Sequence, residues 1–91
     1  MPKFDLGRVV ATPGALRAIR SSGQSPNDFL RRHMNGDWGE HLNGHDIKAN
    51  AVALREGGRL LSGYQTRAGD DIWIITEADR SATTLLLPSE Y

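Results

Sequence analysis

The spacing of hydrophobic residues changes its period near Gly57 and Gly58. Before these glycines, apolar residues recur at helical spacing in three segments, and after them they alternate as in half-buried β-strands. We therefore expect mainly helices in the first part of the chain and mainly strands in the second.

The first part begins with a short β-branched run over residues 4–12, which predicts a strand. Thr12 is a suitable N-cap and Pro13 a favoured first helical residue, so a short helix should follow. Ser25 and Pro26 repeat this signal and predict a second helix. We therefore expect the order strand, helix, helix.

The second helix should end at Asn35 and Gly36, because both residue types tolerate the left-handed conformation of a C-cap. In the corner that follows, Asp37 is expected to accept hydrogen bonds from backbone amides ahead of it, and Trp38 to bury its ring. This corner should lead into the third helix.

The third helix is expected to begin at Asn43 or Asp46. Ile47, Ala51 and Leu54 recur at helical spacing and should share one face.

Three strands should follow, over residues 59–66, 71–77 and 82–88. Glycine and polar turn residues separate them, and Pro88 ends the last one. They should form an antiparallel meander that the N-terminal strand can extend. The expected fold is α+β, a single domain over residues 1–91 with about three short helices packed on a small antiparallel sheet.

A four-residue hairpin loop at residues 78–81 would place Thr76 opposite Thr83 and Ile74 opposite Leu85. The residues between them would then share the other face of the sheet: Trp73, Ile75, Thr84 and Leu86. That face is apolar, and exposed apolar patches usually mark interfaces. We expect the C-terminal tail and the second helix to cover it rather than a second subunit.

Composition narrows the functional classes. Eleven Lys and Arg balance eleven Asp and Glu, and this zero net charge does not favour RNA or an anionic membrane as partner. The chain has no cysteine, so disulfides and thiolate metal sites are excluded. The N-terminus lacks the apolar core of a signal peptide and no apolar run is long enough to span a membrane, which predicts a cytoplasmic protein. The sequence does not choose between a monomer and a homodimer.

The histidines are the first candidates for chemistry. His41 and His45 are four residues apart, but Asn43 and Gly44 interrupt the helix that would align them as metal ligands. We therefore expect no metal and no other cofactor. His33 lies in the last turn of the second helix, where it could act as a general acid or base, or cap the helix end by donating to a free carbonyl.

A second polar cluster lies on the last hairpin. Its members carry a carboxylate, a guanidinium or a hydroxyl: Glu77, Asp79, Arg80, Ser81, Thr83 and Thr84. Such a tip can bind a phosphate, and Ser62 and Tyr64 on the adjoining strand could complete the surface. Equally, Asp79 and Ser81 could satisfy backbone groups of an ordinary turn while Arg80 points into solvent.

The motifs "FxLGxxVATPGAL", "RHxxGDWG", "RLLSGY" and "IWIITEADRSATTLLLPSEY" carry a family resemblance over nearly the whole chain. The sequence resembles a family of roughly ninety-residue uncharacterised proteins of proteobacterial mobile elements, called "plasmid-related protein" and also labelled type I restriction endonuclease subunit M. The second label is rejected, because the chain has no glycine-rich S-adenosylmethionine loop and no Asn/Asp-Pro-Pro-aromatic motif. The resemblance implies a mobile-element setting and a pattern of polar residues: His33, Asp37, Trp38, Asn50, Ser62, Tyr64, Thr76, Glu77, Asp79, Arg80, Thr83 and Thr84.

A more distant similarity, carried by the same C-terminal hairpin, is to barnase-like ribonuclease toxins. It implies a metal-independent ribonuclease in which His33 exchanges protons, Arg80 neutralises the phosphate, and a hydroxyl group orients it. The hydroxyls would come from Thr84, Ser62 or Tyr64, with Glu77 as a further candidate in the catalytic group.

The other hypothesis, which we favour, is a non-catalytic accessory protein with an anti-defence or regulatory role that binds another protein. Its binding candidates are Asp37, Trp38, Asn50, Trp73, Thr76 and Asp79. A concave site lined by the catalytic candidates would favour the enzyme, and an apolar patch would favour the binder.

Overall fold

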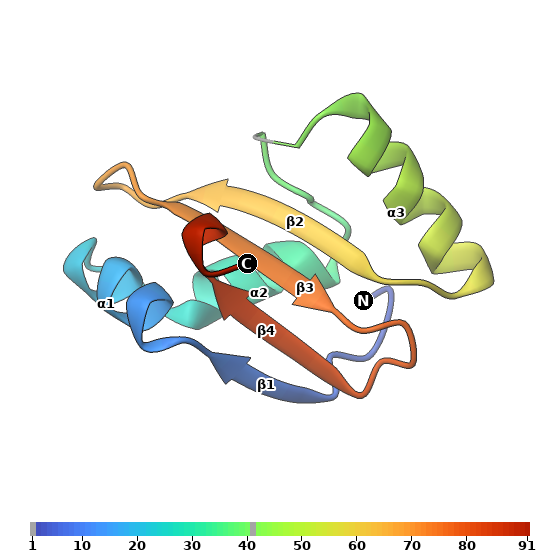
Figure 1. The fold of residues 1–91 in the computed structure, drawn as a ribbon, viewed down its shortest axis with the longest axis horizontal. Helices are drawn as coiled ribbons and strands as arrows, with labels where there is room; N and C mark the ends of the chain where they lie inside the picture. Colours follow the sequence, from blue (N-terminus) through green and yellow to red (C-terminus); the bar gives the residue numbers. More distant parts are fainter. Residues whose placement is uncertain (1, 41) are drawn as a thin grey trace.

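The computed structural model describes residues 2–40 and 42–91. Its elements follow the order β1 (Arg8–Ala11), α1 (Pro13–Ser21), α2 (Pro26–Met34), α3 (Gly44–Glu56), β2 (Leu60–Gln65), β3 (Asp71–Thr76), β4 (Ala82–Leu86) and the short 3-10 helix η1 (Pro88–Glu90). The expected strand and three helices before the glycine pair, and three strands after it, are confirmed (Figure 1).

The four strands form one sheet in the order β1-β4-β3-β2. Strands β2, β3 and β4 make the expected antiparallel meander, and Thr76 lies opposite Thr83 and Ile74 opposite Leu85 as predicted. Strand β1 extends the sheet beside β4, but it runs parallel to β4. The fold is therefore α+β with a mixed sheet.

Helices α1 and α2 cover one face of the sheet, behind it in the view of Figure 1. Ala15 and Ile19 of α1 and Phe29 and Leu30 of α2 form a buried core with four residues of the sheet. Those four are Tyr64, Ile72, Ile74 and Leu85. Removing this apolar surface from water is the main stabilising contribution to the fold.

The C-terminal tail covers part of the opposite face, as predicted. Element η1 lies over the sheet in Figure 1, and the ring of Tyr91 meets Trp73 edge to face at 5.6 Å between centroids. The prediction that the second helix shares this role is wrong, because Phe29 and Leu30 commit α2 to the core face. Instead α3 lies along β2, at the edge of the sheet (Figure 1).

The predicted helix caps position these elements. The Thr12 hydroxyl accepts from the Ala15 amide at 3.1 Å, and the Asn43 side chain accepts from the Asp46 amide at 2.9 Å. Helix α2 ends with Gly36 at a φ of 80°, a left-handed residue as expected. This end turns the chain sharply towards β2.

The face of α3 that carries Ile47, Ala51 and Leu54 is not its buried face. Ile47 is 44% exposed, Ala51 is exposed and Leu54 is half-buried, whereas Asn50 and Ala53 are buried. The reason is a pair of hydrogen bonds: the Asn50 amide donates to the Leu61 carbonyl at 2.6 Å and accepts from the Leu61 amide at 3.0 Å. A polar contact with the edge of β2 therefore orients this helix.

Candidate functional site

His33 lies on the buried face of α2 and is completely inaccessible to solvent. Its Nδ1 is 2.6 Å from the Ser62 hydroxyl on β2, and its Nε2 is 2.8 Å from the Thr76 hydroxyl on β3. It neither caps the helix nor faces an open cleft. The imidazole instead links helix α2 to two strands.

These contacts continue as a chain of hydroxyl groups. The Thr83 hydroxyl donates to the Leu6 carbonyl at 2.7 Å, so it must accept from Thr76, whose hydroxyl lies 2.8 Å away. The single proton of Thr76 is then used, so Thr76 accepts from Nε2–H of His33. Nδ1 is the remaining acceptor and receives the Ser62 proton. The hydrogen bonds thus all point the same way along the chain of groups, from the Ser62 hydroxyl through His33, Thr76 and Thr83 to the Leu6 carbonyl.

Burial sets the ionisation of this site. It lowers the pKa of His33 from 6.5 to about 4, so the ring is neutral near pH 7. Burial also raises the pKa of the Tyr64 phenol, which donates to the Asp37 carbonyl at 2.6 Å. Both groups hold their protons in internal hydrogen bonds.

Arg80 binds backbone carbonyls. Its guanidinium donates to the carbonyls of Gly58 at 2.6 Å, Glu77 at 3.0 Å and Ala53 at 3.0 Å, with a longer bond to Ala78 at 3.3 Å. The Ala53 carbonyl belongs to the last turns of α3, so Arg80 joins that helix to the β3–β4 hairpin. Its own φ of 61° is the left-handed conformation of a tight turn.

The Phe4 ring contacts both proposed catalytic side chains. Its centroid is 5.2 Å from that of His33 and 5.7 Å from the Arg80 guanidinium carbon. It also stacks on Trp38 at 6.2 Å. Aromatic rings and hydroxyl groups therefore surround His33, and backbone carbonyls surround the Arg80 guanidinium. The Phe4 ring lies against both side chains.

The corner after α2 has the predicted anchors. Asp37 accepts from the Gly39 amide at 3.2 Å and from Arg32 at 2.6 Å, and this bond with Arg32 lowers the pKa of the Asp37 carboxyl. The half-buried Trp38 packs its ring against Phe4 and His33. Its backbone carbonyl accepts from the Gly63 amide at 3.0 Å. Asp37 and Trp38 thus fasten the corner to β2.

The remaining hairpin candidates lie apart from His33. Asp79 is exposed and accepts from the Ser81 amide at 2.9 Å, the ordinary turn contact considered above. Glu77 faces Arg59 at 3.5 Å in a partly exposed ion pair. Thr84 alternates with Thr83 along β4 and therefore points to the opposite face of the sheet.

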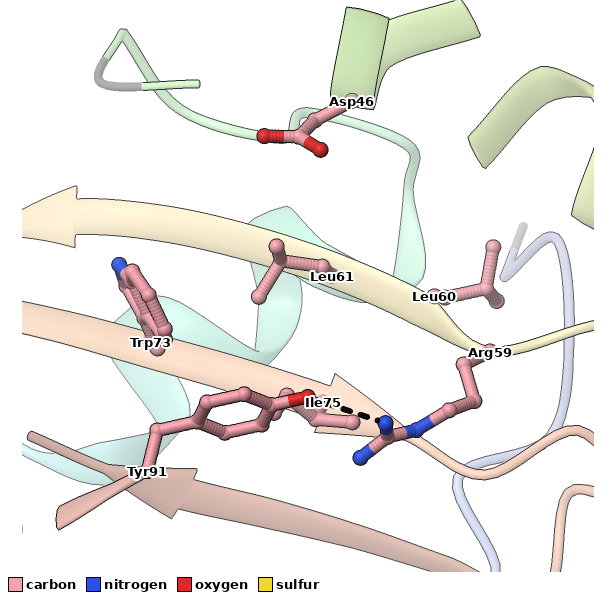
Figure 2. Close-up of a pocket in the computed structure, with 7 residues that line it drawn as sticks. All are labelled: Asp46, Arg59, Leu60, Leu61, Trp73, Ile75 and Tyr91. Atoms are coloured by element: carbon pink, nitrogen blue, oxygen red, sulfur yellow. Dashed lines mark hydrogen bonds between the residues drawn. The ribbon is translucent and has the colours of Figure 1, made fainter. Parts of the chain in front are cut away.

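A hollow of about 340 Å³ lies on that opposite face, beside the C-terminal tail. Figure 2 shows Leu61 and Ile75 on its floor and Trp73 at one side, with the Tyr91 ring lying across β3 towards Arg59. The Arg59 guanidinium donates to the Tyr91 hydroxyl at 3.1 Å and lies 5.8 Å from the ring centroid. Leu60 and Asp46 complete the lining.

Of these residues, the sequence singled out only Trp73 as a binding candidate. The signal for the rest was the apolar alternation of β2 and β3 on both faces, which showed that a second layer was needed. Tyr91 and Arg59 carried no separate signal, because their meeting depends on how the tail folds back over the sheet (Figure 2).

The metal question involves His41, which lies outside the described residues. Among residues 2–40 and 42–91, no group of three or more His, Cys, Asp or Glu side chains is placed to hold a metal ion. In the same part of the chain, no helix is long and apolar enough to cross a membrane.

Comparisons with known proteins add no assignment. No protein-family model matches the chain, and neither a curated protein nor a solved structure matches it. Function is therefore inferred from the geometry of the chain itself.

Proposed function

We propose that the chain is a non-catalytic protein-binding module, acting in the anti-defence or regulatory setting of a mobile element, and that the hollow at Trp73 is its binding site. The observation that carries this proposal is the composition of the hollow. Trp73, Tyr91 and Arg59 belong to the three residue types most enriched at energetically dominant interface positions. They surround an apolar floor.

The shape of the hollow suits one large apolar side chain of a partner. Leu61 and Ile75 offer aliphatic surface, and the Trp73 indole offers an aromatic wall. Arg59 and Asp46 supply charges of both signs at the rim, where hydrogen bonds fix orientation. Tyr91 is 69% exposed, so a partner would bury much of its ring.

Helix α3 extends the apolar surface of this side of the molecule. Ile47, next to the hollow residue Asp46 in the chain, is 44% exposed. Solvent-exposed aliphatic residues on a helix whose packing depends on a polar contact are available for a second protein. We therefore assign α3 to the rim of the same interface.

The polar candidates support a binder rather than a ribonuclease. His33 and Arg80 have internal partners, and among the described residues every buried side-chain nitrogen and oxygen has a hydrogen-bond partner. A general base needs a proton of the substrate within hydrogen-bonding reach. The hollow lined by Trp73 contains neither His33 nor Arg80.

The experiment is site-specific photo-crosslinking in proteobacterial cells that carry the mobile element. A benzoylphenylalanine in place of Tyr91 keeps an aromatic ring at the rim, and the same residue in place of Arg67, in the β2–β3 turn, is the matched control. We expect one discrete protein adduct from position 91 and none from position 67. The partner, once purified, should bind a Tyr91→Ala variant about tenfold or more weakly than the wild type.

Two results would count against the proposal. Adducts of the same pattern from both positions would mean that contact at Tyr91 is not specific. Degraded total RNA in cells expressing the wild type, and intact RNA in cells expressing a folded His33→Ala variant, would favour the ribonuclease alternative.

A further inference from the structure

The two edges of the sheet differ in how their outward-facing backbone groups are hydrogen-bonded. On the outer edge of β2, the Leu61 amide and carbonyl bond to Asn50, and the Gly63 amide donates to the Trp38 carbonyl. Strand β1 forms the other edge, and within residues 2–40 and 42–91 its one neighbour in the sheet order is β4. One edge is therefore closed by the protein itself, and the other is open.

The parallel ladder shows which groups of β1 are available. The Arg8 amide donates to the carbonyl of Ser81, just before β4, and the Thr12 amide donates to the carbonyl of Leu85 on β4, at 3.0 Å each. Because donation alternates along a strand, Val9 and Ala11 direct their amides and carbonyls away from β4. Exposed groups of this kind are a template for another strand.

A second hollow, of about 300 Å³, lies beside this edge, between β1 and α2. Its lining is mostly apolar: Leu6, Val9, Leu30 and Met34, with Asn27 and Arg31. Val9 is 43% exposed although β-branched, and it points into the hollow. A strand added next to β1 would direct alternate side chains over these apolar groups.

The charges at this edge identify the type of partner. Arg31 lines the hollow, Arg8 lies exposed on the strand, and none of the lining residues is acidic. A second copy of the chain would bring these same cations to both sides of the joint, since a two-fold interface faces a patch with itself. An acidic segment meets no such repulsion.

We propose that the open edge of β1 and its hollow towards α2 bind an extended, acidic segment of another protein by strand addition. The backbone of that segment pairs with Val9 and Ala11, an apolar side chain rests over Val9 and Leu30, and a carboxylate reaches Arg31. This surface lies at the opposite edge of the sheet from β2 and does not depend on the hollow at Trp73.

The test is selection of a phage-displayed library of random octapeptides on the folded full chain, followed by synthesis of the enriched peptides. We expect alternating apolar residues with at least one Asp or Glu. In a titration of the wild type with such a peptide, the amide NMR signals of Val9 and Ala11 should be among those that shift most. These amides report strand addition without any substitution.

Three variants locate the binding. Val9→Pro removes an outward-facing donor that the fold does not use, at an edge where proline is tolerated. Arg31→Glu reverses the charge in the hollow, and Arg67→Glu makes the same change in the β2–β3 turn as a control. We expect dissociation constants to rise about tenfold or more for Val9→Pro and Arg31→Glu, and to stay within about twofold for Arg67→Glu.

Other outcomes overturn the proposal. An absence of enriched peptides would show that the edge does not capture extended segments. Peptides that bind Val9→Pro normally but lose affinity for Tyr91→Ala would locate binding at the Trp73 hollow, which would support the proposed function and reject the edge. Self-association of the wild type that Val9→Pro abolishes would show that a second copy is the occupant.

Discussion

The imidazole Nδ1 of His33 on α2 lies 2.6 Å from the hydroxyl oxygen of Ser62 on β2, and Nε2 lies 2.8 Å from Thr76 on β3. Because Thr76 must donate onward to Thr83, the ring proton belongs on Nε2. We expect long-range ¹H–¹⁵N NMR at pH 7 to show a neutral His33 with protonated Nε2. A predominant Nδ1–H form would contradict the direction of this hydrogen-bond chain.

The same burial makes stability depend on pH. The pKa of His33 falls from 6.5 to about 4 on folding, so below pH 6.5 the unfolded chain binds a proton that the folded chain does not. The contribution of the neutral His33 to the free energy of unfolding is therefore fully present above pH 6.5, and it is lost as the pH falls towards 4. Between pH 7 and 5 the free energy of unfolding should decrease by about 2 kcal/mol through this group.

Urea unfolding at both pH values measures that decrease, and a His33→Gln variant provides the control, since it should lose most of the difference. If this variant does not fold, the titration of the His33 ring in the wild type decides the point. An NMR midpoint above pH 6 would contradict the prediction.

The sequence was sufficient for the parts of the fold that depend on local signals. Thr12, Ser25 and Gly36 mark helix ends through their own backbone and side-chain chemistry, and the hairpin length determines the pairing of Thr76 with Thr83. The parallel direction of β1 was not predicted, because it depends on the path of α1 and α2 between β1 and the meander.

The site was harder to predict, because the roles of polar residues depend on their partners. His33 and Arg80 have side chains that ribonucleases use in catalysis. In this fold, however, hydroxyl groups 29 and 43 residues away in sequence bind His33. Carbonyls of α3 and of the hairpin bind Arg80. Nothing in the residues around Asn50 predicted its structural role. Its side-chain amide bonds to both the carbonyl and the amide of Leu61, on a different element.

Asn50 should be the main attachment of α3. Replacement by Leu removes both hydrogen bonds to the backbone of the half-buried Leu61. Each such bond contributes about 0.5–1.5 kcal/mol, so the two together contribute about 1–3 kcal/mol. We expect Asn50→Leu to lower the free energy of unfolding by about that amount and to speed hydrogen exchange at the Leu61 amide. Ala51→Ser, on the exposed neighbouring position, should change exchange at Leu61 little. Unchanged exchange in Asn50→Leu would contradict this role.

The structural role of Arg80 can be tested by its effect on stability. Lysine keeps the charge but cannot hold the fork that reaches Ala53, Gly58 and Glu77 together. We expect Arg80→Lys to lower the free energy of unfolding by about 1–3 kcal/mol. Arg55→Lys, at an exposed position of α3, should change it by less than about 0.5 kcal/mol. Equal effects of the two substitutions in urea unfolding would show that the carbonyl contacts do not stabilise the fold.

The approach of the corner to β2 depends on the absence of a side chain at Gly39. Its φ is 88°, and a Cβ there would lie 1.9 Å from the Gly63 carbonyl oxygen, which is a backbone atom with little freedom to move. Gly23 has a similar φ of 75°, but a Cβ there would meet no atom of the described residues within 4 Å. The two glycines therefore separate backbone strain from steric exclusion.

We expect Gly23→Ala to lower the free energy of unfolding by about 1 kcal/mol, the usual effect of a left-handed alanine. Gly39→Ala should lower it by more than about 3 kcal/mol, or prevent folding, because the corner must move away from β2. That movement would separate the Trp38 carbonyl from the Gly63 amide, now 3.0 Å apart, so the Gly63 amide should exchange faster. Similar urea midpoints for the two variants would show that the corner tolerates displacement from β2.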